Sequence, residues 1–218
     1  MARNGKLRNL RSKWSAMCIV FFFMAVPCAW GGDWDRIREK AIDIQTISAQ
    51  FVQEKHLEIL IKPIVSKGAF YFRAPGSLRW EYFSPIQSIL LMHNGRVRRF
   101  IGSESGFKEN SGPGLQAMEM VLQEITLWLK GEFTDNPNYH SSLEGDNKIV
   151  MVPRNKAFSK IIQKIEILLS DRPGVIETVT IYEGKTSFTK IRFRDVNINQ
   201  GVVDTLFESI SLRNPGES

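Results

Sequence analysis

Cysteine and histidine are scarce in this chain, which has two Cys and three His among its 218 residues. Both cysteines, Cys18 and Cys28, lie before residue 30, so the remaining chain can form no disulfide and no thiolate site. None of the histidines (His56, His93 and His140) has a second His at metal-ligand spacing, and no HExxH or CxxC motif occurs. We therefore expect no metal site and no cofactor.

Recognisable catalytic motifs are also missing. The chain has no G-x-S-x-G nucleophile elbow, and the Gly-Pro-Gly at residues 112–114 lacks the Lys and Ser/Thr of a phosphate-binding P-loop. We interpret the acidic pairs Asp33/Asp35 and Glu119/Glu124 as helix-start and solvent-facing charges. A chain of this size with many apolar residues and no catalytic constellation favours binding over catalysis, so we expect no enzyme.

The N-terminal residues are typical of an export signal. An apolar run over residues 14–26 is shorter than the roughly 20 residues that span a bilayer, and small residues follow it. A basic start, a short apolar run and a small-residue exit are the three parts of a secretory signal, so we predict a signal peptide over residues 1–31. An uncleaved N-terminal anchor is the alternative. The basic residues of this leader are Arg3, Lys6, Arg8, Arg11 and Lys13.

Cleavage before Gly32 would change the charge of the protein. The whole chain has 29 Lys and Arg against 23 Asp and Glu; without the five basic leader residues the count is 24 against 23, a net charge of +1 in place of +6. A nearly neutral domain has no electrostatic footprint for nucleic acid, so we expect no nucleic-acid partner.

Cys28 follows the apolar run, where bacterial lipoproteins carry their acylated cysteine. The preceding Pro27 fits the lipoprotein pattern badly. We therefore interpret Cys28 as an ordinary residue of the signal region, with lipidation as the alternative.

Two segments have the periodicity of helices. From Asp33 as far as Ile44, apolar residues recur on one helical face. The longer segment, residues 115–129, is apolar on several sides, so its own sheet, a ligand or a partner must cover it. Gly131 follows at the position of a helix C-cap.

Most of the remaining chain favours strands. Two hairpins stand out because their strands flank a Pro-Gly turn in one case and an Asn-Gly turn in the other. Alternation of apolar and polar residues predicts one buried and one wet face. The polar, Gly-rich residues 103–114 predict a mobile loop. The predicted strands are 46–56, 68–73, 78–83, 88–93, 96–101, 139–144, 149–152, 161–169, 175–182, 187–196 and 206–212.

These elements predict the α+β class, mainly antiparallel β, with ten or eleven strands in a large curved sheet or open barrel. About 187 residues remain after the leader, the size of one domain. We therefore expect a single domain over residues 32–218.

Aromatic and apolar residues gather on the first hairpin. Phe70 and Phe72 share one face of a strand, and Leu78, Trp80 and Tyr82 share one face of the next. If the sheet curls, one of these sets lines its interior and the apolar helix covers the mouth. A cavity for an apolar ligand and an ordinary packed core are both open readings of this pattern.

Several motifs, taken in order, resemble a known family. The chain has S-A-Q-F-V-Q over residues 48–53, the hairpin G-A-F-Y-F-R-A-P-G-S-L-R-W-E-Y over residues 68–82, and then Pro85 and the Asn-Gly turn. This order, together with the stretch over residues 179–207, is similar to the LolA family of periplasmic lipoprotein carriers. The hairpin is the most specific part of the similarity.

The resemblance implies an open, strongly curved half-barrel of about eleven strands covered by lid helices. Its hydrophobic cavity would take the acyl chains of lipoproteins released by an inner-membrane transporter and pass them to an outer-membrane acceptor, without covalent chemistry. We expect a periplasmic monomer. The residues expected to form the cavity and its lid are Phe51, Phe70, Phe72, Leu78, Trp80, Tyr82, Leu91, Met118, Leu122 and Trp128.

One position departs from the family pattern. Family carriers have an Arg directly before the hairpin proline that is thought to hold the lid, whereas this chain has Ala74 there and Arg73 one residue earlier. A shift of one residue points a strand side chain to the opposite face, so either the backbone bulges or the lid closes differently. Arg73 is the polar lid-closing candidate. A non-transport lipid-binding or envelope-stress sensing module on the same fold is the alternative function.

Overall fold

The computed structural model describes residues 33–112, 115–156, 158–172, 174–208 and 210, except for the side chains of residues 116–118. The predicted signal peptide, its cleavage site and Cys28 lie outside these residues and stay predictions. The single domain over residues 32–218 likewise stays a prediction.

The described chain contains eleven strands, two α-helices and two short 3-10 turns. The helices are α1 (Asp33–Ile42) and α2 (Leu115–Leu129), and the turns are η1 (Phe158–Lys160) and η2 (Asp204–Phe207). The strands are β1 (Thr46–His56), β2 (Ile64–Arg73), β3 (Ser77–Ser84), β4 (Ser88–His93), β5 (Arg96–Ser103), β6 (Gly106–Glu109), β7 (Tyr139–Glu144), β8 (Lys148–Pro153), β9 (Lys164–Leu169), β10 (Ile176–Tyr182) and β11 (Phe188–Ile198).

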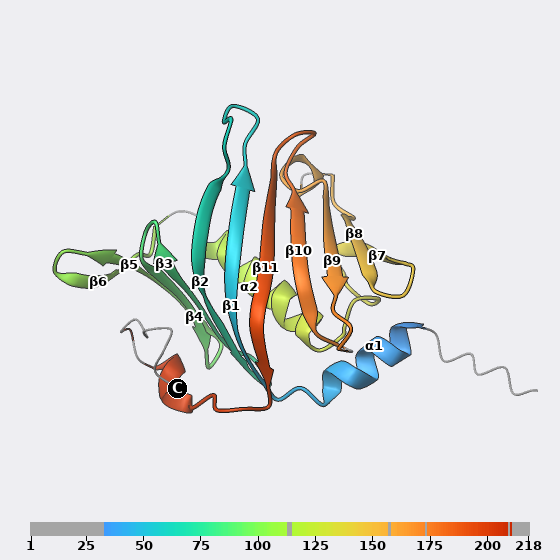
Figure 1. Ribbon diagram of the computed structural model, residues 1–218, viewed down its shortest axis with the longest axis horizontal. Coiled ribbons are helices and arrows are strands. Elements are labelled where there is room, and N and C mark those ends of the chain that lie inside the picture. The colour runs from blue at the N-terminus through green and yellow to red at the C-terminus, as the bar shows by residue number, and fades with distance from the viewer. Residues whose placement is uncertain (1–32, 113–114, 157, 173, 209, 211–218) are drawn as a thin grey trace, which may run out of the picture. The chain divides into compact units, whose positions relative to one another are not determined.

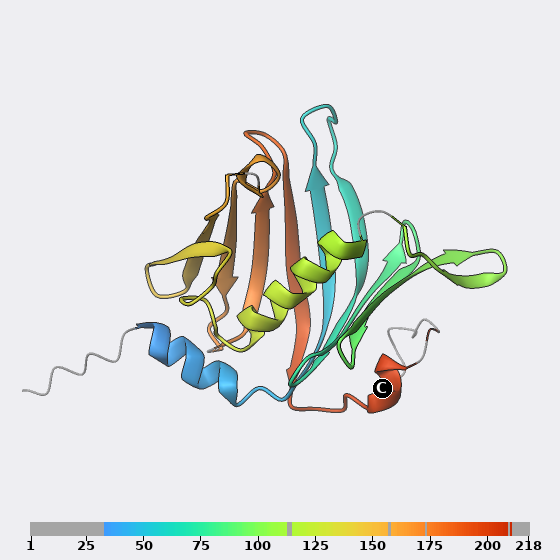
Figure 2. The ribbon, with the colours of Figure 1, turned by 180° about the vertical axis from the view of Figure 1, so that it is seen from behind.

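These strands form one antiparallel sheet in the order β6-β5-β4-β3-β2-β1-β11-β10-β9-β8-β7. The first and last strands therefore lie side by side at the centre, where Phe51 of β1 is opposite Phe193 of β11. The sheet has two free edges, β6 and β7, so it does not close into a barrel. It curves around α2, which crosses the concave face (Figures 1 and 2). The predicted fold class is confirmed.

The apolar helix α2 ends where the sequence predicted. Gly131 has a φ of +72°, and the amide of Glu132 donates to the carbonyl of Leu127 at 2.9 Å, which closes the last turn. A side chain at position 131 would also collide with α1, because a Cβ there would lie 2.8 Å from the Cα of Arg38. Glycine is therefore required both by the backbone conformation and by the packing of α1.

Apolar side chains are buried on both faces of the sheet. The larger cluster fills the concave side between the sheet and α2, and includes Phe51, Phe72 and Trp128. The smaller cluster lies on the other face of β4 and β5, where η2 covers it; it consists of Ile89, Leu91, Phe100, Val202, Leu206 and Phe207. The convex face of β4 is therefore buried as well as its concave face.

Arg79 and Glu81 of β3 form a buried ion pair beneath η2. Arg79 is 1% exposed and Glu81 is 0% exposed. The guanidinium donates from Nε to the Glu81 carboxylate at 2.7 Å and from Nη1 to the carbonyl of Leu206 at 2.8 Å. Since Leu206 belongs to η2, this pair fixes the C-terminal segment to the sheet.

Two predicted elements were wrong. Residues 103–114, predicted as a loop, contain β6, which pairs with β5 after a turn at residues 104–105 that Gly106 follows with a φ of +102°. Phe107 is the one residue of β6 that packs against the smaller cluster, and the other three are exposed, so the polar composition of this strand gave no strand signal. The predicted last strand over residues 206–212 is instead the turn η2 where it is described, because the adjacent side chains of Leu206 and Phe207 are both buried, and successive residues of a strand point to opposite faces.

Candidate functional site

A cavity of about 630 Å³ lies between the concave face of the sheet and α2. Its walls come from β1 to β5 on one side and from β10 and β11 on the other, and α2 covers it. Most of the lining is aliphatic or aromatic. The lining residues are Ile47, Ala49, Gln53, Lys55, Phe70, Trp80, Tyr82, Ser88, Ile89, Leu90, Arg99, Val121, Leu122, Ile125, Trp128, Leu129, Val175, Ile176, Val179, Ile181, Glu183, Thr189, Ile191, Phe193 and Val196.

Strand alternation explains which residues of β1 reach the cavity. Ile47, Ala49, Gln53 and Lys55 line it, and together with Phe51 they occupy alternate positions on the concave face of the strand. Ala49 is opposite Phe70 of β2 and carries only a methyl group. The middle of the sheet therefore offers volume that a larger residue at this position would fill.

An aromatic group forms the rigid wall of the cavity. The rings of Phe70 and Trp80 are 5.3 Å apart between centroids, and those of Trp80 and Phe193 are 6.0 Å apart. Phe51 packs behind them, 5.0 Å from Trp80 and 5.2 Å from Tyr82. The tilted and edge-to-face contacts are those that aromatic pairs prefer, so this wall is packed in the absence of a ligand.

Two indole N–H groups are buried in the lining without a hydrogen-bond acceptor. They belong to Trp80 and Trp128, which are 6% and 4% exposed, and neither nitrogen has a partner among the described residues. The Trp80 N–H is close enough to the Tyr82 hydroxyl to lower the pKa of that phenol against the larger effect of burial, but it does not reach hydrogen-bond geometry. An unpaired buried donor is costly, so an acceptor in the cavity would relieve that cost.

The Tyr82 hydroxyl is already satisfied, because it donates to Oε1 of Gln53 at 2.9 Å. Burial raises the pKa of Tyr82 to about 12. The phenol is therefore neutral over the physiological pH range and supplies no charge to the cavity.

The margin of the cavity is polar at the end where β1 and β10 finish and β11 begins. Lys55 Nζ lies 3.2 Å from Oε2 of Glu183, and Thr189 donates to Oε1 of the same carboxylate at 3.3 Å. Gln53 lies next to this group on β1. An apolar interior with charged groups at its margin suits an amphiphile that has an apolar body and a polar end.

The C-terminal half of α2 is held in place by Glu124. This carboxylate accepts hydrogen bonds from the side-chain amides of Asn136 at 2.6 Å and Asn138 at 2.7 Å. The prediction that Glu124 faces solvent was wrong: it is buried. The pKa of Tyr139 is raised mainly by burial and secondly by the negative charge of Glu124. These two hydrogen bonds connect α2 to the segment that leads into β7.

Half of the predicted cavity residues lie in the lining of this cavity. They are Phe70, Trp80 and Tyr82 from the hairpin and Leu122 and Trp128 from α2. Their role in binding stays a proposal.

The other predicted residues lie elsewhere. Phe51, Phe72 and Leu78 are buried in the concave cluster but do not line the cavity. Leu91 packs on the opposite face of the sheet beneath η2 and does not line the cavity. The side chain of Met118 lies outside the described residues.

Arg73, the residue predicted to close the lid, has its ionic partner on the convex side of the sheet and not on α2. It forms an ion pair with Asp204, at the start of η2. This contact, like that of Arg79, holds the C-terminal segment on the convex side of the sheet. In this chain the arginine stands one residue earlier than in the family pattern, and its side chain accordingly makes its contact on the convex face of the sheet.

The C-terminal strands contribute wall residues that the sequence-based candidates omitted. Val179 and Ile181 of β10 and Ile191 and Phe193 of β11 all line the cavity. Their alternation with polar residues was visible in the sequence and marked them as a buried face. What it could not give was the pairing of β11 with β1, which brings them opposite the first hairpin.

Other kinds of site are not found in the described part of the chain. Within it, no group of three or more His, Cys, Asp or Glu side chains is placed to hold a metal ion. None of its helices is long and apolar enough to cross a membrane.

Comparison with known proteins connects the first half of the sheet to a family. Residues 43–100 match the sequence model of the family described as "Outer membrane lipoprotein carrier protein LolA". This segment contains the hairpin on which the resemblance was recognised, and the match confirms that recognition. No curated protein sequence matches the chain.

Several solved structures are similar to the chain at low sequence identity. A DUF1329 family protein from Desulfovibrio piger is 11% identical, with 80% of this chain and 95% of that chain covered and a TM-score of 0.46. A LolA superfamily protein from Nitrosomonas europaea is 11% identical, with 78% and 95% covered and a TM-score of 0.38. The MucA/MucB complex from Pseudomonas aeruginosa gives 14% identity and a TM-score of 0.47, with 81% of this chain and 60% of that chain covered.

Proposed function

From the premise that this is a LolA-like protein, we propose that it binds lipid acyl chains in the cavity between the concave sheet face and α2. It then carries acylated lipoproteins through the periplasm, from an inner-membrane transporter that releases them to an outer-membrane acceptor. It acts as a monomer, without a cofactor and without catalysis. The observation that carries this proposal is the apolar cavity of about 630 Å³ beneath a single covering helix.

The size and chemistry of the cavity support an acyl ligand. Its volume lies within the roughly 300–1,000 Å³ of typical ligand pockets. Burying about ten methylenes is worth roughly 8 kcal/mol before the cost of ordering the chain is subtracted. Because the transfer needs no covalent step, release depends on exposing the same methylenes again, and movement of α2 is the simplest way to do so.

Lipid extraction from the native protein tests the proposal most directly. We expect mass spectrometry of the protein as cells produce it to show co-purifying acylated lipid or lipoprotein. The same spectra give the N terminus and the state of Cys28. A protein free of lipid that also fails to bind a fluorescent fatty acid would contradict the proposal. Lipid that is bound but never passed to an acceptor would favour the non-transport module.

The two indole donors give a prediction about the cargo. Acyl chains in lipids and lipoproteins end in ester or amide carbonyls, which accept hydrogen bonds. Changing Trp80 or Trp128 to Phe keeps most of the apolar surface and removes the N–H. We expect each change to weaken binding of a fatty-acid methyl ester about 2- to 12-fold, the value of one net hydrogen bond. Displacement of a fluorescent fatty acid measures this affinity.

The matched control is Trp34→Phe, which makes the same change on α1 outside the cavity lining. It should leave the affinity unchanged. Binding of a hydrocarbon of equal chain length should also be insensitive to all three changes. An equal loss for ester and hydrocarbon would show that the indoles act through packing alone.

A further inference from the structure

The loop between β1 and β2 carries apolar side chains that the fold does not use. Ile59 is 87% exposed and Ile61 is fully exposed, and Leu60 between them is also exposed. Ile64 and Val65, at the start of β2, extend the exposed apolar surface. This loop projects from one end of the sheet (Figure 1). A cluster of exposed Ile and Leu on a projecting tip marks an interaction site.

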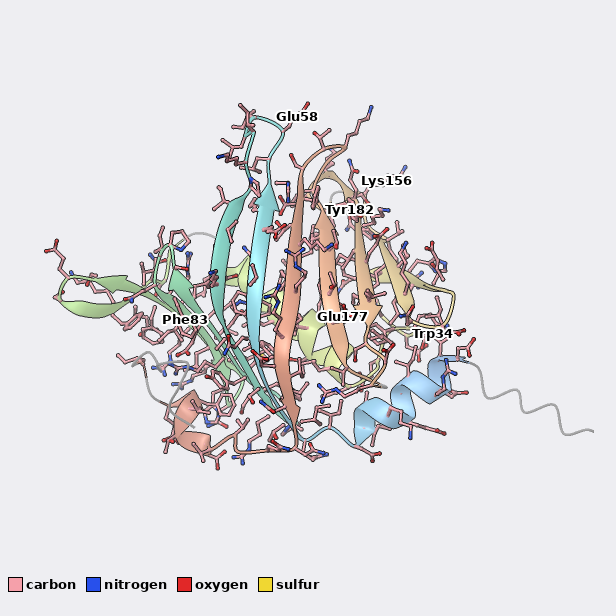
Figure 3. The ribbon with its side chains drawn as sticks, in the orientation of Figure 1. Trp34, Glu58, Phe83, Lys156, Glu177 and Tyr182 are labelled. Atoms are coloured by element: carbon pink, nitrogen blue, oxygen red, sulfur yellow. The ribbon has the colours of Figure 1, made fainter. Side chains whose placement is uncertain are left out.

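Two further loops meet the first one at the same end of the sheet. The amide of Glu58 donates to Oγ of Ser187 at 3.3 Å, which joins the β1–β2 loop to the β10–β11 turn. The amide of Gln163 donates to the carbonyl of Tyr182 at 2.7 Å, which joins the segment after η1 to β10. Figure 3 places Glu58, Lys156 and Tyr182 at this end. We call residues 57–65, 158–163 and 183–187, with Lys156, the apical rim.

The apical rim is cationic as well as apolar. Its lysines are exposed, and the region also includes Ile161, which is 65% exposed. Its carboxylates are Glu58 and Glu183, and Glu183 is paired with Lys55. An excess of positive charge around apolar side chains is the combination that attracts a protein to anionic lipid. The rim lysines are Lys62, Lys156, Lys160 and Lys185.

We propose that the apical rim docks on an anionic lipid bilayer, with Ile59, Leu60 and Ile61 inserted among the lipids. A bilayer accepts side chains that radiate from a narrow tip, whereas a protein partner of standard interface size needs about 800 Å² of complementary surface. The lysines then contact lipid phosphates. Because Glu183 belongs both to this rim and to the polar margin of the cavity, docking brings that margin to the membrane. This last point rests on the proposed lipid-binding function.

Vesicle binding tests the proposal. The probe is a vesicle of phosphatidylethanolamine with a minority of phosphatidylglycerol, compared with vesicles of phosphatidylcholine alone. We expect the double variant Ile59→Ser/Ile61→Ser to bind the anionic vesicles at least about tenfold more weakly, because each inserted Ile contributes apolar burial. Lys62→Gln/Lys160→Gln should weaken binding to the anionic vesicles only.

The matched control is Ile42→Ser/Val203→Ser, which removes two exposed apolar side chains at the opposite end of β1. Ile42 is 61% exposed, and about 36 Å of strand separates it from the rim, given roughly 3.3 Å per residue. This control should bind as the unchanged chain does. Equal binding by all variants, or an equal loss in the control, would overturn the proposal.

Amide hydrogen exchange on the unaltered protein is a second test of docking by the apical rim. Amides of residues 57–65 should become protected when anionic vesicles are added, while those of the β5–β6 ribbon should not. Protection of the ribbon alone would contradict docking by the rim. Binding of a fluorescent fatty acid in solution should be the same in the Ile59→Ser/Ile61→Ser variant, so a failure of docking is distinguishable from a failure of lipid binding.

Discussion

Replacing Arg79 with alanine is expected to lower the free energy of unfolding by about 3–5 kcal/mol, the usual cost of removing one partner from a buried ion pair. The change takes the guanidinium away from the fully buried Glu81 carboxylate and takes a donor from the carbonyl of Leu206. The buried Glu81 carboxylate therefore loses its cationic partner, and η2 loses a contact with the sheet. Urea unfolding followed by circular dichroism measures the loss.

The control for this prediction is the ion pair of Arg192 with Glu54, which also joins side chains of the sheet but is partly exposed. Because exposed pairs contribute about 0–1 kcal/mol, Arg192→Ala should cost little. The double variant Arg79→Met/Glu81→Leu should recover most of the stability, since a whole buried pair can be replaced by apolar residues. A loss for Arg79→Ala no larger than that for Arg192→Ala would refute the assignment.

Much of the fold could be predicted because its signals are local. The hairpin from β2 to β3 is set by its aromatic strands and Pro-Gly turn, and the end of α2 is set by Gly131, so a short window of sequence contains the cause of each. The strand edges were less certain: β2 begins at Ile64, four residues before the predicted start, because its pairing with β1 continues beyond the aromatic stretch.

The candidate site was harder to predict because it depends on contacts between distant segments. Leu91 looked like a cavity residue, but both faces of β4 are apolar, and only the packing of η2 decides that Leu91 belongs to the convex one. Glu124 has the sequence pattern of a surface charge, but the side chains of Asn136 and Asn138, from a later loop, donate hydrogen bonds to it and help to bury it. In both cases the deciding partner lies too far along the chain for periodicity to reveal it.

Changing Val121 to Glu is expected to weaken acyl-chain binding at least about fivefold, since even an uncharged polar group buried without a partner costs about 1–3 kcal/mol. Val121 is on α2 and lines the cavity, yet it is 39% exposed, so the carboxylate stays hydrated when no ligand is present. Glu is also a better helix former than Val. The variant should therefore remain folded. A ligand that fills the cavity must either desolvate the carboxylate introduced by Val121→Glu or leave that part of the cavity empty.

The neighbouring residue supplies the comparison that separates this effect from a general effect of charge on α2. Met120 is 49% exposed and is not part of the lining, so Met120→Glu adds the same carboxylate to the same helix on a different face. Titration with a fluorescent fatty acid should give an affinity close to that of the unchanged chain for Met120→Glu and the loss for Val121→Glu only. Equal losses would mean that charge on the helix acts by lifting α2 from the sheet, and no loss in either would place the acyl chain outside this cavity.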